Sequence, residues 1–225
     1  MKFGPRSVAA AVVAAGAAWL ATPQAFAMNV KQLNVADMVR QSDQIVAGTV
    51  MAVNQGVDPR GLPYTEVQLK VAESIRGSAA GTLTFRQIGH LNSDPAAGGR
   101  KFVGLVAGMP RYTKGEQVVL FLTRPSAIGF RTTIGLEQGR FTLRGGNFEN
   151  GANNAGLFQS VDVSRVTLNA KEKFLVATQE GPVNADTFLT LIRRSVRESW
   201  FAAPPTIRPT KPGGKVIGTV SGVTQ

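Results

Sequence analysis

The chain has 225 residues, 43% of them hydrophobic, with 25 Lys and Arg against 14 Asp and Glu and a formal net charge of +11 at pH 7. This hydrophobic content is ordinary for a globular protein, so we expect one large or two small folded domains. The chain has no cysteine, which excludes a disulfide framework, thiol catalysis, cysteine-bound zinc and iron–sulfur clusters.

The first 27 residues have the pattern of a secretory signal peptide. Lys2 and Arg6 give a positive end, residues 8–21 are an unbroken apolar run, and residues 25–27 form an Ala-Phe-Ala cleavage site. The run is shorter than the roughly 20 residues of a membrane-spanning helix. We therefore expect cleavage after Ala27, a mature chain without a transmembrane span, and a periplasmic or secreted protein of a bacterium.

The mature chain stays strongly basic. Removing the two basic residues of the signal peptide from 25 leaves 23 against 14 acidic residues, a net charge of +9. This excess favours contact with anionic surfaces, the alternative being that scattered basic residues keep a secreted protein soluble. Residues 203–225 are rich in Pro and Gly and no acidic residue follows Glu198, which is typical of a disordered basic tail.

A short helix and then a strand are expected at the start of the mature chain. Residues 29–41 carry spaced apolar side chains, and Asn34 or Asp37 is available as a helix cap. Residues 45–53 are rich in β-branched side chains, which predicts a strand. Gly48 inside this strand indicates a bulge or a close approach of another backbone.

Two further strands follow a turn at residues 58–61. Residues 64–71 alternate between apolar and polar side chains, which predicts one buried and one solvent-facing side. Residues 81–88 supply the next strand. The connection at residues 89–101 holds the single histidine, His90, and long loops in compact domains are often functional.

The strongest β pattern lies in the middle of the chain. Residues 117–122 are a run of apolar side chains after the first residue, which indicates burial on both faces of a strand. Further strands are expected at residues 102–106, 130–134, 136–143 and 157–168, with an Asn- and Gly-rich loop near residues 145–156.

A C-terminal helix is expected within residues 181–202. Asn184 fits its N-cap, and Val183 with Phe188 fits a hydrophobic staple. A stripe of apolar residues recurs every four positions, at Phe188, Ile192, Val196 and Trp200. We expect this stripe to pack on the β-domain, although a membrane-surface helix would have a similar pattern.

The sequence contains no recognised catalytic or metal-binding motif. A Ser-His-acid triad would have to use His90, and neither a G-x-S-x-G elbow nor H-E-x-x-H is present. Glu116 and Glu137 are candidate paired carboxylates for glycoside hydrolysis. Glu116 more simply accepts backbone N–H groups of its own turn, and Glu137 pairs with a neighbouring Arg or Lys. We therefore expect a protein that is not an enzyme and needs no cofactor or metal.

Several motifs together resemble a family of uncharacterised exported bacterial proteins over about residues 31–143. They are SDQIVAGTV at 42–50, YTEV at 64–67 with IRG at 75–77, PRYTKGE at 110–116 with VLFL at 119–122, and GLEQGRF at 135–141. The same layout is similar to the five-stranded OB barrel of netrin-like and tissue-metalloprotease-inhibitor domains. Those inhibitors depend on disulfides and on an N-terminal cysteine that meets the zinc, and this chain has neither.

The resemblance implies a mainly β fold. We expect a small antiparallel OB-like barrel within residues 28–180, a short N-terminal helix, and the C-terminal helix packed on the barrel.

The leading functional hypothesis is an exported, non-catalytic binding protein whose partner is a protein or an anionic polymer of the envelope. The 89–101 loop and the 109–116 turn would form one rim of the barrel. Arg100, Arg111 and Tyr112 are the expected contact residues on that rim.

Two alternatives come from other classes of protein. One is an inhibitor or companion of a secreted protease, and the other is a binder of nucleic acid or acidic glycan. Export of the protein disfavours a role in binding intracellular nucleic acid. Such binding also needs pairs of aromatic and basic side chains, and the sequence has few of them. The best candidates are Phe85 with Arg86 and Phe130 with Arg131.

Overall fold

The structure, a computed structural model, describes residues 31–90 and 108–201. Five expected features lie outside these described residues: the signal peptide at 1–27, all but the first two residues of the rim loop at 89–101, Arg100 within it, the strand at 102–106, and the tail at 203–225. The chain separates into units 1–31 and 32–225, and every helix and strand below belongs to the second unit.

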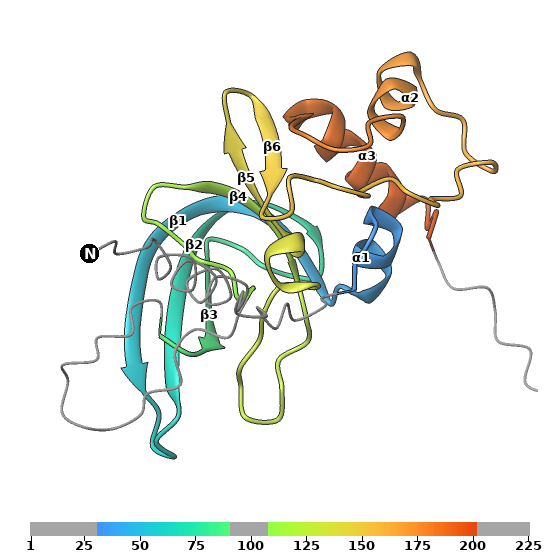
Figure 1. Cartoon of the computed structure of the whole chain (residues 1–225). Helices are drawn as coiled ribbons and strands as arrows, with labels where there is room; N and C mark the ends of the chain where they lie inside the picture. The colour runs from blue at the N-terminus through green and yellow to red at the C-terminus, as the bar shows by residue number, and fades with distance from the viewer. Residues whose placement is uncertain (1–30, 91–107, 202–225) are drawn as a thin grey trace, which may run out of the picture. The chain divides into compact units, whose positions relative to one another are not determined.

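Seven antiparallel strands form one sheet in the order β3-β2-β1-β4-β5-β6-β7 (Figure 1). They are β1 (Gln44–Val57), β2 (Pro63–Arg76), β3 (Thr82–Ile88), β4 (Gln117–Leu122), β5 (Arg140–Arg144), β6 (Asn147–Asn150) and β7 (Val183–Asn184). β3 and β7 are the two edges, so the sheet is not closed into a barrel. The mainly β fold is confirmed, whereas the expected barrel closure is not found among the described strands.

The segment between β4 and β5 differs from the two strands expected there. The strand expected at residues 130–134 forms only two isolated bridges. Gly135, with φ 65°, then turns the chain into the 3-10 helix η1 (Leu136–Gly139), where residues 136–143 are expected to be extended. The positive φ and the short helix end the extended path of the chain at this point, and β5 begins only at Arg140.

β1 and β2 are 14 residues each and pair as one long hairpin. The register shifts beside Gly48, where an added Cβ would lie 2.3 Å from the carbonyl oxygen of Lys70. Both the bulge and the close backbone approach expected at Gly48 are therefore confirmed. The alternation expected in the second strand is confirmed as well, because three of its side chains are fully buried on one face: Thr65, Val67 and Leu69.

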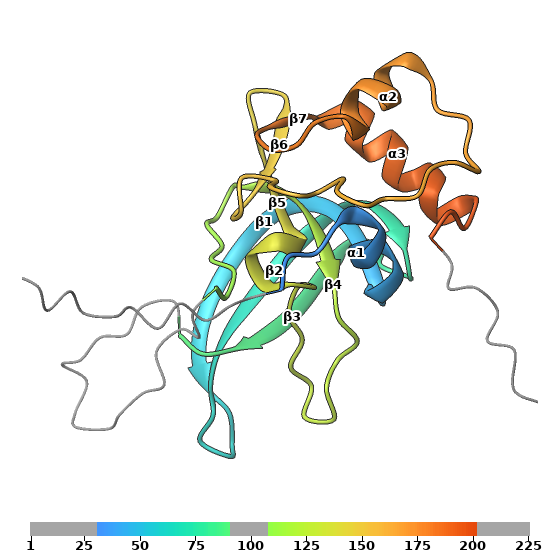
Figure 2. The same ribbon diagram turned by 45° about the vertical axis from the view of Figure 1, so that its right-hand side comes forward.

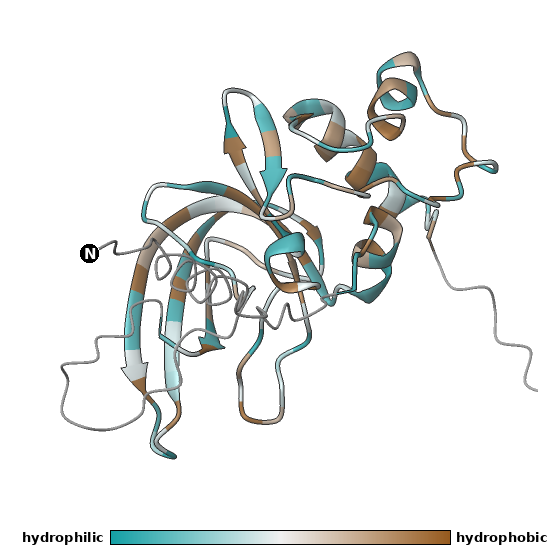
Figure 3. Cartoon of the chain, viewed as in Figure 1, coloured by the Kyte–Doolittle hydropathy of each residue, from teal (hydrophilic) through white to brown (hydrophobic). Residues whose placement is uncertain are grey.

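β4 lies between two clusters of buried apolar side chains. Val119 and Phe121 belong to the larger cluster, which the sheet shares with the helices, and Val118, Leu120 and Leu122 belong to the smaller cluster on the other face. All five are at most 2% exposed, which confirms the expected burial on both faces. Figure 3 shows the apolar segments on the sheet and on the helices, interrupted by polar ones.

The C-terminal helix is docked on the sheet as expected. α3 (Ala185–Arg197) begins after Asn184, whose side chain accepts a hydrogen bond from the backbone N–H of Thr187. Phe188 and Ile192 are fully buried in the larger cluster, and the ring of Phe188 lies 4.9 Å from that of Phe141. The hydrophobic stripe thus supplies one wall of the core. Figure 2 shows α3 directly after β7, at the end of the sheet where β6 and β7 lie.

The N-terminal helix is also confirmed. α1 (Val35–Gln41) begins after Asn34, whose side chain accepts a hydrogen bond from the N–H of Asp37. Val35, Met38 and Val39 pack into the same cluster as α3. Both helices therefore cover the same face of the sheet.

The region expected to be a loop near residues 145–156 contains a strand. Gly145 and Gly146, with φ 54° and 79°, form the two-residue turn of a hairpin, and β6 occupies the next four residues. Asn150 and Asn154 are buried. The side chain of Asn150 accepts hydrogen bonds from the N–H groups of Ala152 and Asn154 in the turn that follows, and the side chain of Asn154 accepts one from the N–H of Asn150. The asparagines therefore order this region.

The prediction of a strand at residues 157–168 is wrong. Leu157 and Phe158 are buried in a succession of turns, and Ser160, with φ 56°, interrupts an extended path. The chain then forms a helix that sequence analysis did not anticipate, α2 (Ala170–Val176). Its N-terminus carries a capping box between Asn169 and Glu172.

Candidate functional site

The candidate site is built on residues 109–116, the segment that enters β4. Three hydrogen bonds fasten this segment to the strands beside it. The side chain of Gln87 donates to the carbonyl of Pro110 (2.8 Å), the N–H of Gly115 donates to the carbonyl of Val50 (2.8 Å), and the N–H of Val50 donates to the carbonyl of Glu116 (2.9 Å). The segment is therefore held at both ends although it belongs to no strand.

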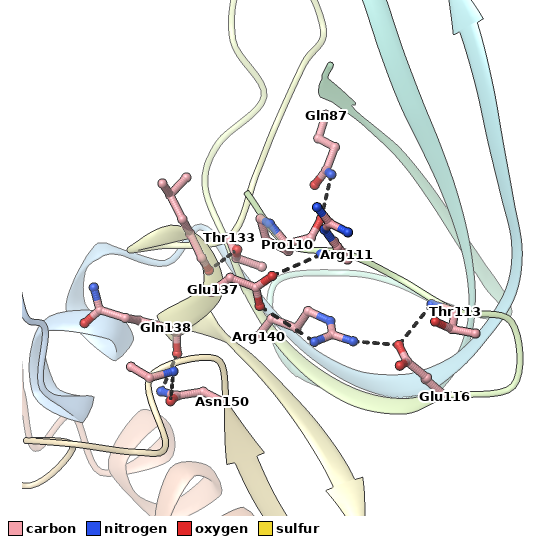
Figure 4. A network of polar contacts seen from close by, with 12 residues as sticks. Gln87, Pro110, Arg111, Thr113, Glu116, Thr133, Glu137, Gln138, Arg140 and Asn150 are labelled. Carbon is pink, nitrogen blue, oxygen red and sulfur yellow. Dashed lines mark hydrogen bonds and ion pairs between the residues drawn. The ribbon is translucent and has the colours of Figure 1, made fainter. Parts of the chain in front are cut away.

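Arg140, the first residue of β5, connects this segment to η1 (Figure 4). Its Nη2 lies 2.6 Å from Oε2 of Glu116, and its Nη1 lies 3.8 Å from Oε2 of Glu137. The arginine side chain is only 12% exposed. Ion pairs of low exposure are less screened by solvent than surface pairs, so these contacts restrain the segment more than an exposed pair would.

Each of these carboxylates also binds the backbone of the 109–116 segment. Glu116 accepts a hydrogen bond from the N–H of Thr113 (3.0 Å), and Glu137 accepts one from the N–H of Arg111 (3.2 Å). Both expectations from the sequence are confirmed: Glu116 satisfies an N–H of its own turn, and Glu137 pairs with an arginine. We call Glu116, Glu137 and Arg140 the Arg140 cluster.

Burial sets the electrostatics of the cluster. It raises the pKa of Glu137 above the ordinary value for Glu, and the charge of Arg140 opposes this rise. Burial also raises the pKa of the Tyr112 hydroxyl far above its usual range, so Tyr112 stays neutral at physiological pH. The guanidinium of Arg140 lies 5.3 Å from the centre of the Tyr112 ring, a cation–π contact.

The three predicted contact residues have different surroundings. Arg111 is exposed, whereas Tyr112 is 5% exposed and packs edge-on against Phe85, with ring centres 5.7 Å apart. Tyr112 is thus a core side chain that holds the segment in place. Arg100 lies outside the described residues, so Arg111 is the predicted contact residue that the structure places at the surface.

A surface hollow of about 590 Å³ lies beside this segment. Residues 51–55 of β1 form one side, and residues 111–114 form the other. We call it the rim hollow. Arg111 and Lys114 are exposed on its second side, and neither makes an ion pair with another described residue.

Lys114 belongs to the predicted rim turn at residues 109–116 but was not among the expected contact residues, and residues 51–55 were not part of the predicted site. The rim hollow exists because residues 115 and 116 bond to Val50, a pairing across more than sixty positions of the chain. The pattern of neighbouring residues in the sequence cannot reveal a contact between positions so far apart. The Lys114-Gly115 turn was the available indication, since Gly115 adopts φ 91° and presents the preceding lysine at a sharp bend.

The aromatic and basic pairs considered for nucleic acid are engaged within the protein. Phe85 and Phe130 are buried. Arg86 pairs with Glu66 at 2.7 Å, and Arg131 donates to the carbonyl of Thr123 at 3.0 Å. These side chains therefore do not form an open stacking surface.

His90 contacts the backbone of the β1–β2 hairpin. Its Nε2 lies 2.9 Å from the carbonyl oxygen of Gly56, which connects the end of β3 to the tip of the β1–β2 hairpin. In the described parts of the chain, no three His, Asp or Glu side chains group closely enough to hold a metal ion. Within the same residues, no helix is both long and apolar enough to cross a membrane.

The open sheet, the docked helices and the Arg140 cluster define a β-rich domain with a restrained, basic surface segment. Comparisons of the chain with protein-family models, with curated proteins and with solved structures gave no match.

Proposed function

We propose that this protein is an exported, non-catalytic binding module that holds an acidic partner protein at the rim hollow. The observation that carries the proposal is the pair of exposed cations, Arg111 and Lys114, on one side of that hollow. Export follows from the pattern of the first 27 residues.

Restraint of the backbone supports a binding role. The N–H groups of Arg111 and Thr113 are bonded to the carboxylates of the Arg140 cluster, so the backbone that carries the cations is ordered before a partner arrives. A surface ordered in advance loses less conformational entropy on binding.

The charge balance around the hollow favours an acidic partner. Glu116 and Glu137 both pair with Arg140, and the charge of Arg111 also acts on Glu137. The two carboxylates with Arg140, Arg111 and Lys114 therefore leave a net charge of +1 beside the hollow. Unpaired cations at a polar surface attract anionic groups and speed the encounter with them.

We also propose that β1 to β4 belong to a partly open OB-like barrel. In the segment between β4 and η1, Phe130 forms a parallel bridge with Arg86 of β3, and Thr133 forms an antiparallel bridge with Leu122 of β4. The segment thus contacts two strands in the way a fifth barrel strand would. This layout agrees with the resemblance to netrin-like domains, and the rim hollow would lie at one end of the barrel.

The test uses the mature chain from residue 28, a double variant Arg111→Ala/Lys114→Ala, and a matched double variant Arg144→Ala/Lys173→Ala. Arg144 and Lys173 are exposed and lie away from the hollow, so both double variants lose the same charge. Binding is measured by fluorescence anisotropy with a labelled poly-glutamate peptide, and by retention of envelope proteins on the immobilised chain.

We expect the rim double variant to lose at least tenfold in affinity and the matched variant to keep its affinity within about twofold, since a tenfold change is about 1.4 kcal/mol. Equal losses in the two variants would contradict the proposal, because net charge alone would then account for binding. Stronger binding to heparin or single-stranded DNA than to the peptide would favour the anionic-polymer alternative.

A further inference from the structure

Another concave surface lies in the helical part of the protein. It is a groove of about 430 Å³ between α2 and the β7–α3 junction. Most of its walls are apolar, and they include Phe174 and Leu175 of α2 with Pro182 and Val183 before α3. We call it the α2 groove. No part of the Arg140 cluster or of the rim hollow lines it.

Phe174 is unusually accessible for an aromatic residue. It is 81% exposed, the largest exposed fraction among the large hydrophobic residues that the structure describes. An exposed aromatic ring beside an apolar groove marks a surface that can bury an apolar ligand. A cavity of about 150 Å³ is enough to hold a benzene molecule, so the α2 groove has room for a larger apolar body.

Lys171 is the one charged residue among those that line the groove. It is exposed and makes no ion pair with another described residue. The carboxylate next to it in sequence, Glu172, points into the protein and is bound by Arg194 at 2.6 Å. The groove therefore combines apolar walls with a single cation that has no ion-pair partner in the part of the chain that the structure describes.

The groove walls are held in place from within. The capping box of Asn169 and Glu172 fixes the start of α2, and the contact of Glu172 with Arg194 fixes α2 against α3. On the other wall, Val183 pairs with Phe148 in the sheet. A groove with restrained walls does not need to be ordered by its ligand, which favours binding of a small molecule.

We propose that the α2 groove binds a small amphiphile made of an apolar body and one carboxylate, such as a medium-chain fatty acid. The apolar body lies against Phe174, Leu175 and Val183, and the carboxylate lies at the ammonium group of Lys171. An uncharged amphiphile would use only the apolar walls, and a cationic one would meet like charge. This inference concerns a site separate from the rim hollow and does not depend on the proposed function.

The experiment titrates octanoate into the mature chain by isothermal titration calorimetry, with octanol and octylamine as uncharged and cationic probes. We expect saturable binding of octanoate, and at least tenfold weaker binding of the other two. Octylamine binding as tight as octanoate would overturn the proposal, and so would the absence of saturable octanoate binding at millimolar concentration.

Three variants locate the site. Lys171→Ala and Phe174→Ala are each expected to weaken octanoate binding at least tenfold. Lys173→Ala removes the same charge from an exposed position of α2 that does not line the groove, and it is expected to bind as the unchanged chain does. Because all three side chains are exposed, circular dichroism should show the same fold for each variant.

Equal effects of Lys171→Ala and Lys173→Ala would overturn the assignment, because they would indicate general attraction by a basic helix. Sedimentation of the free chain tests another occupant of the groove. A dimer that disappears in Phe174→Ala would assign the groove to a second copy of the chain and would also overturn the proposal.

Discussion

Nη1 of Arg194 lies 2.7 and 2.6 Å from the two carboxylate oxygens of Glu172, and this carboxylate is 1% exposed. The contact joins α3 to α2, the helix that sequence analysis did not anticipate. Glu172 also accepts a hydrogen bond from the backbone N–H of Asn169, so one buried side chain fixes both the start and the packing of α2.

We predict that Glu172→Gln lowers the free energy of unfolding by about 2–3 kcal/mol, because loss of the buried carboxylate leaves Arg194 with only its longer ion pair, to Glu198 at 3.4 Å. The value is below that of a fully buried pair because the Arg194 side chain is 24% exposed. Urea denaturation measures the change. Glu180→Gln, at an exposed position, is the control and should change the value by less than about 0.5 kcal/mol.

We predict that Arg140→Met lowers the free energy of unfolding by about 1.5–3 kcal/mol, since hydrogen bonds to charged groups contribute about that much. The methionine retains the apolar stem and removes the contacts with Glu116 and Glu137. Amide hydrogen exchange should accelerate at Arg111 and Thr113, whose N–H groups bond to these carboxylates. Arg144→Met, at the exposed end of the same strand, should leave both amides protected; faster exchange in the control alone would contradict the role given to Arg140.

We predict that Gly48→Ala is more destabilising than Gly81→Ala. At Gly48 the new methyl group would lie 2.3 Å from a backbone oxygen of the paired strand, so β1 and β2 must separate locally. At Gly81, with φ 70°, nothing lies within 4 Å of the added atom, and the cost is only the left-handed strain of about 1–2 kcal/mol. Thermal unfolding of both variants gives the comparison, and equal shifts in Tm would show that the close approach at Gly48 is readily relieved.

We predict an acid-side loss of stability from Glu73. Hydrogen bonds from Arg193, at 2.7 Å to each carboxylate oxygen, lower the pKa of Glu73 below its ordinary value of 4.5. The unfolded chain therefore takes up this proton first as the pH falls. The stabilisation by the pair is complete above pH 4.5 and disappears as the pH falls through the lowered pKa of the folded state.

The measurement compares the unchanged chain with Glu73→Gln in urea between pH 3 and pH 7. The difference between them should be about 0.5 kcal/mol near neutral pH, because both partners are partly exposed and such pairs contribute little. It should shrink toward zero in acid. A difference that grows as the pH falls would contradict the assignment.

Helices and strands that are determined by residues close together in the sequence were predictable. The caps at Asn34 and Asn184 act within three residues along the chain, and the apolar run of β4 identifies a strand buried on both faces. Gly48 was informative because a glycine inside a strand usually marks a bulge or a close approach of another backbone. In each case the residues that determine the structure lie beside each other in sequence.

Elements decided by distant contacts were not predictable. The apolar residues of 157–168 suggest alternation, yet Leu157 is fixed by its carbonyl, which accepts a hydrogen bond from the N–H of Val35 at 2.7 Å. In the candidate site, Glu116 and Glu137 were correctly expected to bind an N–H and an arginine, but Tyr112 is in the core because Phe85 and Arg140 reach it from other strands. The capping box at Asn169 was a local sign of α2 that sequence analysis passed over.

The short length of β7 has a consequence for how the protein behaves at high concentration. β7 has only two residues, and the second of them, Asn184, is already the N-cap of α3. A long, flat edge strand offers a row of backbone groups on which strands of other molecules can assemble into aggregates. At this edge the chain turns into a helix before such a row can form, so the fold itself protects the end of the sheet against fibril-like association.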